Sequence, residues 1–179
     1  MRGFQLWLNL PSREKMKPAA YQDIPASKIP VVKLPQGGDV RVIAGTLDLD
    51  GVVTHGPVNG NGARITTDPS YLDVRLPADA EFSMPIAAGH NAFVYTYEGS
   101  ATIGANAEAK LLPHRAAGVL SDGDRLHAKA GPEGLRFLLL AAKPLREPVV
   151  QYGPFVMNTR EEIEQAVADY RDGRLGSAA

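Results

Sequence analysis

Cysteine is absent from the 179 residues of this chain. Its absence excludes disulfides, thiolate nucleophiles and zinc sites built on cysteine. Long apolar runs are also lacking, because the longest lies near Leu138 to Ala142, well below the roughly 20 residues of a membrane span. The formal net charge is only −1, so no global field attracts nucleic acid or an anionic membrane. We therefore expect neither a nucleic-acid partner nor a membrane partner.

The segment Met1 to Gln5 lacks the apolar stretch and the small-residue cleavage site of a signal peptide. Hydrophobic residues make up 44% of the chain and charged residues 22%, which is ordinary for a soluble globular protein. These features predict a cytoplasmic protein. The 18 glycines and 14 prolines are spread along the chain, a distribution typical of many turns between short strands.

Several segments have the composition or the alternation of β-strands. Tyr71–Leu76 alternates cleanly, which predicts Tyr71, Asp73 and Arg75 on one face and the three aliphatic residues on the other. Ala92–Tyr97 followed by Glu98-Gly99-Ser100 indicates a hairpin. Further strands are predicted at Val40–Ala44, Ala116–Leu120 and Leu135–Ala142, and turn signals at this spacing favour a sandwich or a barrel.

The two ends of the chain differ from this pattern. Phe4–Leu10 is apolar and aromatic and predicts a strand that stops at Pro11. Ser12–Pro35 is polar and rich in proline, which predicts an extended linker arm. Near the C-terminus, Thr159 and Glu162 have the spacing of a capping box, and the apolar residues after them recur at helical spacing. One C-terminal helix is therefore expected, with Gly173 as its stop.

Several of these segments resemble the pirin family. The tail is the most specific part: Lys143 to Val149, then Gly153-Pro154-Phe155-Val156-Met157-Asn158-Thr159, then Glu161-Glu162-Ile163. Phe4 to Pro11 resembles the segment that leads out of that family's first domain. Tyr71-Leu72-Asp73, Glu98-Gly99 and Ile103-Gly104 resemble strands of its second domain. The resemblance covers nearly the whole chain.

The resemblance implies an all-β, cupin-type (jelly-roll) barrel with a linker arm and one C-terminal α-helix. It also implies three parts, namely an interdomain strand and arm at 1–36, a C-terminal cupin barrel at 37–150, and an extension with the helix at 151–179. Pirins resemble two cupin barrels in tandem, with iron in the N-terminal barrel. Some members show quercetinase activity and others act as transcriptional coregulators. Because the family's metal segment lies upstream of everything seen here, we expect the catalytic half to be absent, or the native product to begin upstream of Met1.

The barrel encoded here is not expected to hold a metal of its own. Aligning Gly99 with the first cupin glycine places Pro85 and Ala87, or Ile86 and Ala88, at the histidine positions and Ala92 at the glutamate position. Aligning Gly123 and Gly131 with the later glycines places Gly134 at the last histidine. No side chain at these positions is a metal donor. We therefore predict no catalytic, metal or cofactor residues, and iron only in the N-terminal domain of full-length relatives.

The four histidines receive separate interpretations. His55, His90 and His114 are interpreted as solvated loop residues, and a metal ligand outside the cupin register is the alternative for His90. His127 is the best candidate to point inward, but it has no second histidine two or four residues away. Strand parity also allows Thr96 and Arg136 to face the interior, where an arginine would need a partner. Thr96, His127 and Arg136 are therefore weak candidates for an interior ligand site, and satisfied core residues are the alternative.

Two functional hypotheses remain. The first is a non-catalytic C-terminal cupin domain with a scaffold or interaction role. The second is a part of a metal-dependent, quercetinase-like dioxygenase whose metal lies in the missing N-terminal cupin domain. Without a first barrel, the Phe4–Leu10 strand exposes apolar side chains and an edge that favour association. We therefore expect self-association, or pairing with an N-terminal cupin half, through this strand.

Overall fold

The computed structural model describes residues 3–60 and 65–175. Contacts between residues divide the described chain into two compact units. One unit comprises 24–144, and the other joins 3–23 to 145–175. Each unit is described by itself below. The predicted boundaries at 36/37 and 150/151 stay predictions, although the grouping of the two chain ends was not foreseen.

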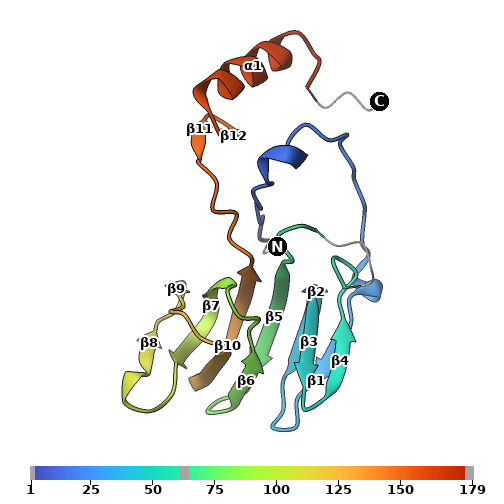
Figure 1. Cartoon of the computed structure of the whole chain (residues 1–179). Coiled ribbons are helices and arrows are strands. Elements are labelled where there is room, and N and C mark those ends of the chain that lie inside the picture. Colours follow the sequence, from blue (N-terminus) through green and yellow to red (C-terminus); the bar gives the residue numbers. More distant parts are fainter. Residues whose placement is uncertain (1–2, 61–64, 176–179) are drawn as a thin grey trace. The chain divides into compact units, whose positions relative to one another are not determined.

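The unit 24–144 is built almost entirely of antiparallel strands (Figure 1). Eight of its strands form one sheet, with β1-β2-β5-β10-β7-β8 as the main path, β6 beside β10 and β9 beside β7, while β3 and β4 form a separate hairpin. The strands are β1 (Val31–Lys33), β2 (Asp39–Ala44), β3 (Thr46–Leu49), β4 (Val52–His55), β5 (Ser70–Leu76), β6 (Glu81–Pro85), β7 (Asn91–Ile103), β8 (Lys110–Leu112), β9 (Ala117–Val119) and β10 (Arg125–Ala142), with 3-10 turns η2 (Ala26–Lys28) and η3 (Asn106–Glu108).

The core of this unit is formed by alternate residues of neighbouring strands. Leu72 and Val74 on β5 are fully buried, while Arg75 between Val74 and Leu76 is exposed. The predicted faces of Tyr71–Leu76 are therefore confirmed. Phe137 on β10 packs edge-to-face on Phe82 of β6, with ring centroids 6.1 Å apart. Aromatic pairs with this geometry add to the stabilisation from buried area, so these two strands are held together by side chains as well as by their backbones.

Strand β10 is the central strand of the sheet because it pairs with three neighbours. Its first half pairs with β6, its second half pairs with β5, and both halves pair with β7. The β7–β10 ladder shifts register between Ala130 and Leu135. Gly99 lies opposite this irregularity with a φ of +67°, a conformation that glycine adopts without penalty. The predicted hairpin at Glu98–Ser100 is therefore wrong: Gly99 marks a bulge inside one long strand, and bulges kink a strand without reversing it.

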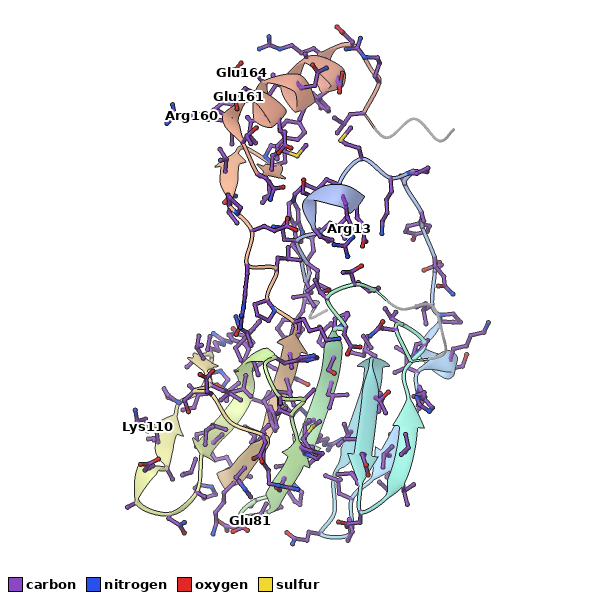
Figure 2. All side chains as sticks on the ribbon, in the orientation of Figure 1. Arg13, Glu81, Lys110, Arg160, Glu161 and Glu164 are labelled. Atoms are coloured by element: carbon purple, nitrogen blue, oxygen red, sulfur yellow. The ribbon has the colours of Figure 1, made fainter. Side chains whose placement is uncertain are left out.

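The second unit contains the only α-helix among the described residues. Helix α1 (Arg160–Arg171) follows the two-stranded sheet of β11 (Val150–Tyr152) and β12 (Phe155–Met157). The predicted capping box is present, because Thr159 Oγ1 accepts from the Glu162 N–H at 3.2 Å and the Glu162 carboxylate accepts from the Thr159 N–H at 3.1 Å. Arg160, Glu161 and Glu164 project from the helix away from its β-hairpin (Figure 2). The predicted helix is confirmed.

The arm contributes a short turn to this second unit. Residues Ser12–Glu14 form the 3-10 turn η1. The backbone N–H of Ser12 donates to Glu147 Oε2 at 2.8 Å, and Lys15 Nζ donates to the carbonyl of Val156 at 2.8 Å. These bonds join segments more than 130 residues apart in sequence, so the arm and the tail form one folded piece.

The predicted strand at Phe4–Leu10 is wrong. The structure assigns no strand to this segment, and no other described segment pairs with it. High strand propensity alone does not form a strand, because its backbone groups need a partner strand. The segment is instead extended chain ending at Pro11, and its Leu10 N–H is satisfied locally by the Asn9 side chain at 3.0 Å.

Candidate functional site

A pocket of about 330 Å³ opens in the unit 24–144 where β2, β6 and β10 end and β5 begins. Its lining combines apolar residues with hydroxyl, carboxylate and imidazole groups. We call this space the end pocket. It is lined by Gly45, Thr46, Asp48, Asp68, Ser70, Met84, Pro85, Ile86, Ala87, His90 and Ala141.

His90 is the buried polar group of the end pocket. Its side chain is only 4% exposed, although it belongs to the short loop between β6 and β7. Its Nε2 atom has no hydrogen-bond partner in the described part of the chain. The carboxylate of Asp68 is close by, with its Oδ2 3.8 Å from Nε2, too far for a direct hydrogen bond. The gap between these two atoms is therefore the distinctive geometry of the pocket.

Asp68 is fixed in place by its other neighbours. Its Oδ1 accepts from Asn59 Nδ2 at 2.9 Å, and its Oδ2 lies 3.5 Å from Lys143 Nζ. Asn59 is itself held, because its Oδ1 accepts from the Ile65 N–H at 2.8 Å. A carboxylate with partners on both oxygens has a defined orientation, so Asp68 presents a fixed acceptor to the pocket.

The protonation states of His90 and Asp68 follow from these contacts. Burial lowers the pKa of His90, the Asp68 charge raises it, and the Lys143 charge lowers it again, with a net decrease. The hydrogen bond from Asn59 lowers the pKa of Asp68 and outweighs the effect of burial. At neutral pH the pocket therefore contains a neutral imidazole beside an ionised carboxylate.

The interpretation of His90 as a solvated loop residue is wrong. Its burial depends on Asp68, 22 positions earlier in the chain, and on the ends of three strands. No local periodicity marks the segment Gly89-His90-Asn91, so the sequence held no signal for this burial. A buried histidine needs long-range neighbours that only the fold supplies.

The structure separates the three residues predicted as interior ligand candidates. Thr96 on β7 is fully buried and faces the core, as expected. Its hydroxyl donates to the carbonyl of Pro113 and accepts from the Ala116 N–H at 3.2 Å. Because both functions of the hydroxyl are used within the protein, Thr96 ties a loop to the sheet and is not part of the end pocket.

His127 and Arg136 do not face the interior. His127 is exposed between buried Leu126 and Ala128 on β10, because alternation places it on the outer face. Arg136 lies on the outer face for the same reason, since its neighbour Phe137 takes the interior position. The guanidinium Nε of Arg136 lies 3.1 Å from Glu98 Oε2 on β7. The expectation that His127 and Arg136 point inward is thus wrong, although the partner that Arg136 needs is present outside.

Arg136 contributes instead to a second, larger pocket of about 650 Å³ on the outer face. This pocket lies between the β1–β2 turn, the end of β5 and the bulge of β10. Its three basic residues, Lys33, Arg75 and Arg136, are matched by three acidic ones, Asp39, Glu98 and Glu133. Two of the cations are paired, because Arg136 Nε lies 3.1 Å from Glu98 Oε2 and Lys33 Nζ lies 3.2 Å from Asp39 Oδ2. The pocket therefore has no strong preference for either sign of charge.

The interior of the barrel does not fit an iron centre. Ala92, which aligns with the cupin glutamate, is buried in the apolar core. Gly134, which aligns with the last histidine, adopts a φ of +79° at the bulge of β10. Among residues 3–60 and 65–175 no group of three or more histidine, aspartate or glutamate side chains is arranged to hold a metal. A mononuclear site needs several converging donors, and these residues do not provide them.

The comparison with protein families identifies the chain through its barrel and tail. Residues 71–176 match the family described as the Pirin C-terminal cupin domain. The chain belongs to the pirin family. The family resemblance and the predicted cupin-type fold with one helix are therefore confirmed.

Individual pirins and their relatives match over almost the whole chain. A Pseudomonas aeruginosa protein with the provisional name quercetin 2,3-dioxygenase is 45% identical over 176 residues, which cover 98% of this chain and 59% of that protein. Human Pirin is 41% identical over 178 residues, covering 97% of this chain and 57% of the relative. The chain thus spans somewhat more than half the length of these curated pirin relatives.

A solved structure supports the same fold. The crystal structure of quercetin 2,3-dioxygenase from Acinetobacter baumannii superposes with a TM-score of 0.80 at 32% identity, covering 96% of this chain and 56% of that one. Among the described residues, no helix is long and apolar enough to cross a membrane. The cytoplasmic location stays a prediction.

Proposed function

We propose that this pirin chain is a non-catalytic cupin domain with a scaffold or interaction role. The observation that carries the proposal is the lack of donor side chains at the positions that align with cupin ligands, where Ala92 and Ile86 are buried in the apolar core and Pro85, Ala87 and Ala88 are exposed. Val94, Leu139 and Phe137 are fully buried in this core together with Ala92. Packed side chains are sufficient to fill a small barrel, so the fold does not depend on a metal.

The proposed function predicts that the chain alone does not oxidise flavonols. Oxygen consumption with quercetin is the direct measurement, with the Acinetobacter baumannii enzyme as the positive control. We expect a rate equal to that of buffer with the chain alone, before and after incubation with ferrous iron. A saturable, iron-dependent rate from the chain would contradict the proposal.

The second candidate function is a part of a quercetinase-like dioxygenase. It is favoured by the names of two relatives, since the Pseudomonas aeruginosa protein carries the provisional name quercetin 2,3-dioxygenase and the Acinetobacter baumannii protein carries the same name. In this proposal iron lies in an N-terminal cupin domain, and the present chain shapes or stabilises that domain. Adding a separately produced N-terminal half should then change its rate with quercetin, and an unchanged rate would count against the candidate.

The arm of the second unit, residues 3–23, is the proposed interaction surface. Trp7 is 68% exposed and Leu8 is 42% exposed, and exposed Met16 and Tyr21 follow in the same arm. Clustered exposed apolar side chains mark association surfaces. We propose that an N-terminal cupin half covers them, because the relatives are longer than this chain by more than a third of their length. Self-association is the competing outcome.

Trp7 provides a built-in reporter for this proposal, since it is the single tryptophan of the chain. Its emission should shift to shorter wavelength when an N-terminal half is added, because the indole leaves water. Light scattering of the chain alone distinguishes self-association from a monomer. Unchanged emission together with a mass equal to one chain would contradict the proposed surface. A Trp7→Ser variant tests whether association depends on this side chain.

A further inference from the structure

The end pocket has an unused polar group that its neighbours do not satisfy. His90 Nε2 is buried and has no hydrogen-bond partner among the described residues, although its side chain lines the pocket. Leaving a buried polar atom without a partner is unfavourable, so such atoms are expected to meet a bound group or solvent. Thr96, a fully buried polar residue of the same unit, shows the contrast, because its hydroxyl is satisfied within the protein.

The chemistry around Nε2 selects the group that fits. Asp68 only accepts hydrogen bonds, whereas neutral His90 either donates or accepts at Nε2 according to its tautomer. A hydroxyl both donates and accepts, so one hydroxyl between the two residues satisfies either tautomer. The separation of 3.8 Å is too long for a direct hydrogen bond. An oxygen that lies to one side of both atoms, at about 2.8 Å from each, can bridge them.

Charge further restricts the ligand. Asp48 and Asp68 both line the pocket and oppose an anion. A cation would compete with Lys143, whose Nζ already lies 3.5 Å from Asp68 Oδ2. A neutral molecule meets neither obstacle. The hydroxyls of Thr46 and Ser70, which also line the pocket, add further partners for a ligand with more than one hydroxyl group.

The size and the apolar lining of the pocket agree with this chemistry. The volume of about 330 Å³ lies at the lower end of the range for small-molecule sites. Met84, Pro85 and Ile86 supply an apolar surface for the C–H groups of a ligand. We propose that the end pocket binds a small neutral polyol of monosaccharide size, with one hydroxyl bridging His90 and Asp68. The proposal is independent of the proposed scaffold role, because binding requires no catalysis and no metal.

Imidazole NMR of the intact chain tests this proposal directly. The four histidines give separate ¹⁵N resonances, and that of His90 is assigned from its loss in a His90→Gln variant. Glucose, myo-inositol and glycerol serve as probes at increasing concentration. We expect at least one of them to shift the His90 resonance saturably, with the resonance of exposed His127 unchanged. If all three leave the His90 resonance unchanged, the pocket holds only water and the proposal is overturned.

Matched variants locate the binding site. His90→Gln should raise the dissociation constant roughly two- to tenfold, the effect of one hydrogen bond, while His127→Gln should leave it unchanged. Ala87→Phe places a ring on an exposed pocket residue and should abolish binding without removing a polar group. Equal binding by the parent chain and Ala87→Phe would overturn the proposal. So would a shift of His90 produced by zinc but by none of the three polyols.

Discussion

The hydroxyl of Tyr97 on β7 donates to Asp73 Oδ1 on β5 at 2.6 Å. Strand β10 lies between these two strands in the sheet. The bond therefore spans three strands on the outer face of the unit 24–144. Burial and the hydrogen bond to Asp73 raise the pKa of Tyr97 well above its usual range, so the phenol remains a donor across the accessible pH range.

Removing this donor should destabilise the barrel. We expect Tyr97→Phe to lower the free energy of unfolding by about 1–2 kcal/mol, because a hydrogen bond to a carboxylate is stronger than a neutral one. Urea unfolding at neutral pH measures the change. Tyr21→Phe is the control, since Tyr21 is 91% exposed. Equal stability of Tyr97→Phe and the parent chain would show that the bond contributes nothing net.

Two glycines that align with cupin motifs should respond differently to alanine. Gly99 has a positive φ, and a Cβ there would collide with the carbonyl oxygen of Gly134. Gly99→Ala should therefore cost about 3 kcal/mol or more, or prevent folding. Gly123 has open space for a Cβ, so Gly123→Ala should change stability by less than about 0.5 kcal/mol. Thermal unfolding compares them, and similar melting temperatures would contradict the bulge at Gly99.

The lowered pKa of His90 predicts a pH dependence of stability. The folded chain binds a proton at His90 less readily than the unfolded chain does. Protonation of His90 therefore favours the unfolded chain. The free energy of unfolding has its full value above the unfolded pKa of about 6.5 and decreases as the pH falls below it. Unfolding in urea at pH 7.5 and at pH 5.5, values that bracket ~6.5, should show a smaller decrease for His90→Gln than for the parent chain. His127→Gln should keep the full decrease, and a decrease unaffected by His90→Gln would contradict the burial.

The capping box should control the start of α1. Thr159→Ala should destabilise the helix by about 1 kcal/mol, which corresponds to roughly fivefold faster exchange of its amide hydrogens. Hydrogen exchange followed by mass spectrometry measures this for the segment 160–171. Glu164→Gln, on the exposed side of the helix (Figure 2), should leave the exchange rate unchanged. Equal protection in both variants would mean that the cap is not used in solution.

The sequence correctly predicted the parts of the fold that depend on a local pattern of residues. Tyr71–Leu76 alternates in sequence and in burial, and Thr159 caps the helix that its spacing predicted. The strand predicted at Phe4–Leu10 was wrong because strand propensity does not indicate whether a partner strand exists. The hairpin predicted at Glu98–Ser100 was wrong because glycine at positive φ occurs in bulges as well as in hairpins.

The candidate site was harder to foresee than the fold. Strand parity placed Thr96 correctly. It failed for Arg136 because Leu138 and Leu140, which share its parity on β10, are buried as well, so apolar residues do not mark one face of this strand. His127 was favoured because it lies in a strand, yet the strand presents it to solvent. His90 lies in a loop, and its burial results from Asp68 and from strand ends that are distant in sequence. Such burial becomes visible only once the fold is known.

The most direct test of the account is the metal content of the purified chain. The untagged chain is produced in iron-supplemented cells, and iron is measured by mass spectrometry against protein concentration, before and after reloading with ferrous iron. The account predicts far less than one iron per chain in both samples, because the donor positions are occupied by alanine, proline and glycine. One tightly held iron per chain would contradict it.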